Sequence, residues 1–113
     1  METPSGQIAE MMTDGIRYRH YMITKHAAER FMQRVTTALD EMFICLDRAV
    51  LADRANQKDV RIMEQIKRAE RGGGYVITDP ESHAYFFIAM DGRPHCICTV
   101  MTLEMMTYSG CSK

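Results

Sequence analysis

The chain has 113 residues, which suits one domain of ordinary size. Apolar residues make up 46% of it, charged residues 26%, and the net charge is −1, which argues against a strongly basic, non-specific nucleic-acid binder. It holds no run of about 18 apolar residues and begins with no basic and apolar leader, so we expect no membrane association, a cytoplasmic location and four reduced cysteines.

The first predicted elements are an arm, a strand and a helix. Residues 1–15 contain Pro4, Gly6 and Gly15, and we expect a flexible arm or a short helix there. Apolar and polar residues alternate over residues 16–23, which predicts one strand. Thr24 is a good N-cap for a helix over residues 25–34.

Two further helices are predicted before the middle of the chain ends. A capping-box-like start at Thr37 precedes apolar residues at helical spacing, so a second helix is expected to run to about Ala52. Residues 59–71 have high helix propensity and place Ile62, Ile66 and Ala69 on one face. Three glycines at positions 72–74 end this third helix.

The remainder of the chain predicts strands. Residues 75–78, 85–90 and 96–103 are rich in β-branched and aromatic residues, and turn-forming residues at 79–82 and 91–94 separate them. Strands this close in sequence pair as antiparallel hairpins, because a parallel pairing needs a long crossover. We therefore expect a single α+β domain over residues 16–108, with N-terminal helices packed on one face of an antiparallel meander and a tail at 109–113.

The most informative stretch lies in the first helix. His26, Arg30 and Arg34 are spaced four residues apart, so they form one row on a helix, while Ala27, Phe31 and their neighbours form an apolar face. Five Lys or Arg and two His lie between residues 17 and 34 against one Glu, so the region is locally basic. Such a row is suited to bind phosphate and places a titratable imidazole at one end.

The segment from Ile23 to Arg34 resembles the helix of small bacterial and phage proteins with the pattern I-T-x-H-A-x-x-R-x-x-x-R. In those proteins a helical pair precedes a β-meander whose last strand reads like residues 97–100 here. The group is similar to the RelE-type toxins of the barnase–colicin–RelE ribonuclease superfamily, and the resemblance covers roughly residues 22–103.

This resemblance implies a metal-independent endoribonuclease or RNA-binding protein, with RNA, including ribosome-associated RNA, as its partner. It makes His26 the acid or base, Arg30 and Arg34 the phosphate binders, and Thr99 a residue that orients the phosphate or substrate. The alternative is a non-catalytic phage or bacterial regulator that inhibits a host protein through a Met-rich sheet face ending at Met105 and Met106. An antitoxin protein or a second copy of the chain is a further expected partner.

The other motifs favour structural roles. Cys96 and Cys98 form a C-x-C pair without the spacing of a zinc finger, so we expect structural thiols, no metal and no cofactor. The three glycines precede a strand, whereas phosphate-binding loops precede a helix. His83 and His95 lie at or beside turns and are expected at the surface.

Overall fold

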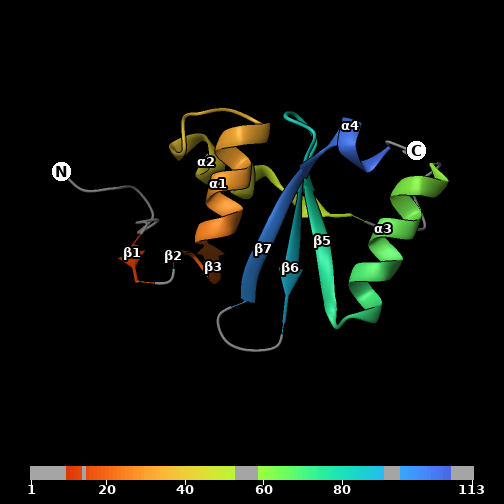
Figure 1. Cartoon of the computed structure of the whole chain (residues 1–113), viewed down its shortest axis with the longest axis horizontal. Coiled ribbons are helices and arrows are strands. Elements are labelled where there is room, and N and C mark those ends of the chain that lie inside the picture. Colours follow the sequence, from red (N-terminus) through yellow and green to blue (C-terminus); the bar gives the residue numbers. More distant parts are fainter. Residues whose placement is uncertain (1–9, 14, 53–58, 91–94, 108–113) are drawn as a thin grey trace.

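The computed structural model describes residues 10–13, 15–52, 59–90 and 95–107. This part of the chain contains a seven-stranded mixed sheet in the order β1-β2-β3-β7-β6-β5-β4, together with four helices (Figure 1). The α+β class predicted from the sequence is confirmed. The proposed tail at 109–113 lies outside the described residues.

The N-terminal part of the sheet has more strands than predicted. It consists of β1 (Glu10–Met12), β2 (Gly15–Tyr18) and β3 (Tyr21–Thr24), each antiparallel to the next. The single strand expected over 16–23 is therefore a hairpin, and the end of the expected arm belongs to the sheet. The turn was missed because Arg19 adopts a φ of +58°, which a residue other than glycine seldom does.

The helices of the first half are α1 (Lys25–Arg34) and α2 (Asp40–Arg48). The predicted bounds of α1 are confirmed, with Thr24 as its N-cap. The predicted start of the second helix at Thr37 and its end near Ala52 are wrong: α2 begins at Asp40 without a side-chain cap. Its expected last turn is instead the edge strand β4 (Val50–Leu51), which pairs with β5.

The second half follows the prediction closely. Its elements are α3 (Val60–Arg71), β5 (Gly74–Asp79), β6 (Ala84–Ala89), β7 (His95–Thr102) and the short α4 (Leu103–Met106). Asp59 caps α3 by accepting a hydrogen bond from the backbone N–H of Arg61. The strands β5, β6 and β7 form the expected antiparallel meander.

One pairing joins the two halves of the chain. The strand β3 pairs with β7 in parallel, with Tyr21 opposite His95 and Ile23 opposite Ile97. All elements from α1 to β6 lie between these two strands in sequence, so they form the long crossover that a parallel pair requires.

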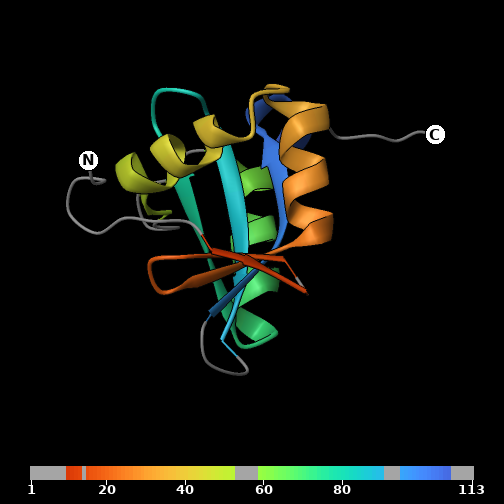
Figure 2. The same cartoon turned by 90° about the vertical axis from the view of Figure 1, so that its left-hand side faces the viewer.

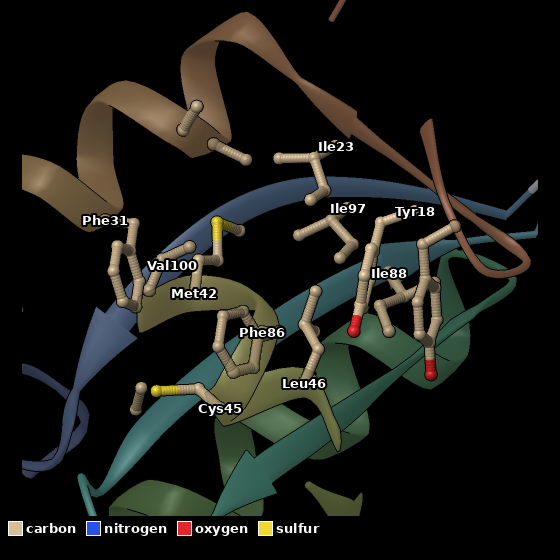
Figure 3. Packing of buried hydrophobic residues seen from close by; sticks show 14 of the residues in the cluster. Tyr18, Ile23, Phe31, Met42, Cys45, Leu46, Phe86, Ile88, Ile97 and Val100 are labelled. Carbon is tan, nitrogen blue, oxygen red and sulfur yellow. The ribbon is translucent and has the colours of Figure 1, made fainter. Parts of the chain in front are cut away.

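Helices cover both faces of the sheet, with α1 and α2 on one side and α3 on the other (Figures 1 and 2). Phe31 of α1 and Met42 of α2 pack with Phe86, Ile97 and Val100 of the sheet, all fully buried (Figure 3). A second cluster on the opposite face joins α3 and α4 to the sheet; its buried residues are Ala52, Ile62, Ile66, Val76, Tyr85 and Met106.

A buried carboxylate ties α2 to the β5–β6 hairpin. Asp79 is completely buried and accepts hydrogen bonds from Arg48 at 2.7 and 3.2 Å, from the Ser82 hydroxyl at 2.7 Å and from the backbone N–H of Glu81 at 3.1 Å. Burial alone would raise the pKa of this carboxyl group, but the hydrogen bonds from Arg48 and its neighbours hold it well below its usual range. Asp79 is therefore ionised, and the positive charge of Arg48 balances its negative charge.

Candidate functional site

The first helix is anchored to the last strand by Thr24. Its hydroxyl accepts a hydrogen bond from the backbone N–H of Ala27 at 3.1 Å and donates to the carbonyl of Ile97 at 2.9 Å. The same side chain thus caps α1 and fastens it to β7. As a result, the row predicted on α1 has a fixed position relative to the sheet.

The first two members of that row lie together on the outer surface of α1. His26 is exposed and Arg30 is half-exposed. Arg30 donates from Nε to Nε2 of His26 at 3.2 Å and from a terminal nitrogen to Oε1 of Gln33 at 3.0 Å. The contact with Arg30 therefore occupies Nε2 of the imidazole.

Arg34, the third member, is turned toward the sheet. It donates to the carbonyl of Val100 at 2.7 Å, beyond Ile97, where the pairing of β3 with β7 has ended. Its guanidinium therefore supplies the hydrogen bond that the Val100 carbonyl would otherwise accept from a neighbouring strand. Burial, and then the charge of Arg30, lowers the pKa of Arg34. This contact gives Arg34 a structural task that the sequence did not indicate.

Thr99 is not brought to this row. A bulge in the pairing of β6 with β7 places Ile97 opposite Ile88 but Thr99 opposite Phe87, which leaves Cys98 as the extra residue. Phe87 packs against the cluster on the α3 side. Facing partners in a sheet share a face, so Thr99 also lies on the α3 side, and the bulge directs Val100 toward α1 instead.

A second group of polar side chains gathers where β3, β5 and β7 begin. Tyr75 of β5 reaches over β6, so that its hydroxyl lies 2.8 Å from Nδ1 of His95 on β7. The ring of His20, from the β2–β3 turn, lies 6.1 Å from that of His95, centre to centre, and 4.0 Å from that of Tyr21. Two imidazoles and two phenols are thereby brought together.

The environment of this group sets its protonation. Partial burial, then the neighbouring His95 and Arg19, lowers the pKa of His20, so its imidazole is neutral at pH 7. Burial raises the pKa of Tyr21 and of Tyr75, so both phenols stay protonated.

Asp47, the nearby carboxylate, is held by other side chains. It accepts hydrogen bonds from the Tyr18 hydroxyl at 2.9 and 3.0 Å and from Arg19 at 2.9 Å. Burial and the bond to Asp47 raise the pKa of Tyr18 to about 12.

No local pattern of residues predicts this second group. His20 and His95 are 75 positions apart, and only the parallel register of β3 with β7 makes them neighbours. His95 was expected as a surface residue, but it is half-buried and hydrogen-bonded to Tyr75. In the structure, His20 immediately precedes β3 and His95 is the first residue of β7.

The remaining sequence hypotheses concern thiols, metals and methionines. Cys45, Cys96 and Cys98 form no disulfide, and no group of three or more metal-ligating side chains gathers among the described residues. The expectation of an exposed Met105–Met106 edge is wrong for Met106, which is 1% exposed in the cluster beneath α3 and α4. The Met-rich sheet face is thus covered by helices.

No helix in the described part of the chain is long and apolar enough to cross a membrane. Comparison of the chain with family models, curated proteins and solved structures finds no match in any of the three. We therefore infer the function from the arrangement of the side chains.

Proposed function

We propose that this protein binds RNA, and that the outer face of α1 contacts the phosphate backbone. The observation that carries the proposal is the set of partners of Arg30. Within the described residues, Arg30 donates only to His26 and Gln33, and neither side chain carries a negative charge. Its positive charge is therefore held in place but not compensated, which suits it to an anion from solution.

The surroundings of Arg30 support this assignment. Lys25 is exposed in the first turn of α1, and Arg34 lies one turn further along from Arg30. The positive end of the helix dipole is at the same end as Lys25. Glu29 is the single acid on this helix, so the local charge is basic although the whole chain carries −1. A local basic surface on a near-neutral protein favours binding of nucleic acid at one defined place over non-specific binding by the whole surface.

RNA, rather than another polyanion, follows from the resemblance of residues 23–34 to the RelE-type group. That resemblance also suggests ribosome-associated RNA as a target. In this proposal His26 positions Arg30, because the lone pair of its Nε2 is already used. The regulator hypothesis has less support, because helices cover the Met-rich sheet face on which it depended.

Fluorescence anisotropy with a labelled single-stranded RNA tests the proposal. We expect Arg30→Ala to raise Kd about tenfold and to reduce the slope of log K against log salt by about 1, since one phosphate contact is lost. The matched control is Arg61→Ala, because Arg61 is also exposed but is paired with Asp59 at 2.8 Å. Equal affinities of the Arg30 variant and the unmodified protein would contradict the proposal, as would equal weakening by the control.

A DNA oligonucleotide of the same sequence tests the choice of nucleic acid. We expect weaker binding to DNA than to RNA, because RNA offers a 2′-hydroxyl and a different backbone shape to the helix surface. Equal affinity for the DNA and RNA oligonucleotides would agree with the phosphate contact on α1 but would overturn the assignment to RNA.

A further inference from the structure

We infer that Met22, Cys96 and Cys98 form a binding site for the soft monovalent ion Cu(I). The three sulfur atoms come from the neighbouring strands β3 and β7. The site lies on the α3 face of the sheet, opposite α1, so it is independent of the proposed RNA contact.

Strand pairing places the side chains of Met22 and Cys96 on one face of the sheet. Met22 of β3 lies opposite Cys96 of β7, and Cys96 lies opposite Ala89 of β6. Residues that face each other in adjacent strands direct their side chains to the same face. Ala89 lines an apolar hollow together with Ala69 of α3, which identifies this face as the α3 side. A thioether and a thiol are therefore neighbours there.

The bulge in β7 brings the second thiol to the same face. Ile97, between the two cysteines, is fully buried in the cluster on the α1 side. Cys98 is the extra residue of the bulge, and it lines the same hollow as Ala89. Its Sγ lies 3.7 Å from the carbonyl oxygen of Cys96, so the thiol is turned back along the strand toward that residue. Two thiols and one thioether thus converge on one surface.

The chemistry of these donors selects the ion. Thiolate and thioether sulfurs are soft ligands, and they favour Cu(I) over Mg²⁺, Ca²⁺ and Mn²⁺, which prefer oxygen. A structural zinc site uses four cysteine, histidine or carboxylate ligands, and the described residues do not bring even three of these types together. Cu(I) accepts a thioether and is satisfied by fewer ligands, so the lack of a zinc-finger spacing does not argue against it.

Exposure and surroundings suit the uptake of an ion from solution. Cys98 is exposed, Met22 and Cys96 are half-buried, and the two cysteines form no disulfide. Ala69 and Phe87 in the wall of the hollow keep water from one side of the site, and such an apolar shell controls solvent access to a metal. On binding, each thiol releases its proton to solvent as its sulfur bonds to the ion. The complex of one Cu(I) with two thiolates then carries one negative charge.

The experiment loads the full, reduced chain with Cu(I) under argon, in competition with the chelator bicinchoninate. We expect one Cu(I) per chain and only sulfur ligands in the X-ray absorption spectrum. Cys96→Ser and Cys98→Ser should each raise the Kd for Cu(I) by more than about 10²-fold, because even loss of an outer-shell partner costs about 10–100-fold. Met22→Leu should raise Kd less and should remove one sulfur from the absorption spectrum.

Two variants are matched controls for the loss of a sulfur. Met11→Leu removes a methionine of β1 that is 78% exposed, and Cys45→Ser removes a thiol that is buried in the cluster on the α1 side. Both should leave the affinity for Cu(I) unchanged. Copper should raise the free energy of unfolding of the unmodified protein but not that of the Cys96 and Cys98 variants, which without metal should be as stable as the unmodified protein.

Each contrary result has a distinct meaning. Failure of the unmodified protein to hold Cu(I) against bicinchoninate would overturn the site, as would binding that survives both serine substitutions at positions 96 and 98. Equal weakening by Cys45→Ser would show general thiol binding instead, and an unchanged spectrum in Met22→Leu would remove Met22 from the site. Equal affinity for Zn²⁺ would overturn the assignment to Cu(I). RNA binding by the copper-free protein is measured separately, so the proposed function stands or falls on its own.

Discussion

Two regions of the protein hold an arginine in hydrogen bonds and use its charge in opposite ways. At the junction of α2 with the β5–β6 hairpin, Arg48 donates to Asp79, which is completely buried. On α1, Arg30 donates to His26 and Gln33, neither of which carries a negative charge. A guanidinium paired with a buried carboxylate is part of the core, whereas one with neutral partners keeps its charge available for an external anion. The partners of an arginine therefore indicate its role better than its position on a helix.

The largest expected effect follows from removing the buried carboxylate. Asp79→Ala leaves Arg48, the Ser82 hydroxyl and the backbone N–H of Glu81 without their acceptor. We expect the free energy of unfolding, measured with urea, to fall by about 3 kcal/mol.

The matched control is Glu81→Ala, because Glu81 meets the same arginine at 3.3 Å but is 70% exposed. Its loss should cost less than about 0.5 kcal/mol. If the two substitutions cost the same, Asp79 is not the compensating charge that distinguishes this region from α1.

The second prediction concerns pH. The pKa of Asp79 is held below its ordinary value in the folded state, so its contribution is fully present above the ordinary aspartate pKa and is lost as the pH falls below it. We expect stability below about pH 4 to decline with an added slope of up to about 1.4 kcal/mol per pH unit. Urea denaturation at several pH values should show this added slope in the unmodified protein and not in Asp79→Asn.

The smallest effect is expected at Arg34. Its guanidinium donates to a backbone carbonyl, so it is neither paired with a carboxylate, as Arg48 is, nor bonded only to side chains, as Arg30 is. Arg34→Ala leaves the carbonyl of Val100 without its donor. We expect the free energy of unfolding to fall by about 1–2 kcal/mol and RNA affinity to fall less than in Arg30→Ala. Thermal unfolding and anisotropy on the same sample check this. A variant as stable as the unmodified protein but as weak in RNA binding as the Arg30 variant would make Arg34 a phosphate contact.

The parts of the fold that could be predicted are those specified by neighbouring residues. The helix α1 follows from Thr24 and its apolar face, and the meander β5–β7 follows from strand-forming residues separated by turns. The β2–β3 turn was not predictable, because Arg19 adopts its positive φ without a glycine or proline nearby. The strand β4 exists because Val50 and Leu51 pair with β5, and no local pattern encodes that pairing.

The candidate site shows the same division. The spacing of His26 and Arg30 predicted one row on the helix, and the two side chains lie in contact there, since residues four apart on a helix are neighbours. The position of Thr99 depends on a bulge, and one extra residue reverses the face on which a side chain lies. The approach of His20 to His95 depends on the register of two strands from opposite ends of the chain. Such tertiary relations leave no short-range pattern.

The parallel pairing of β3 with β7 also sets the order in which the molecule can be assembled. The N-terminal hairpin is made first during synthesis, but its partner strand begins only at residue 95. Closing a loop of that length carries a high entropic cost, and contacts so distant in sequence slow folding. The pairing of β3 with β7 therefore forms only after β7 has been synthesised. His20 and His95 become neighbours in that same step, because Tyr21 pairs with His95.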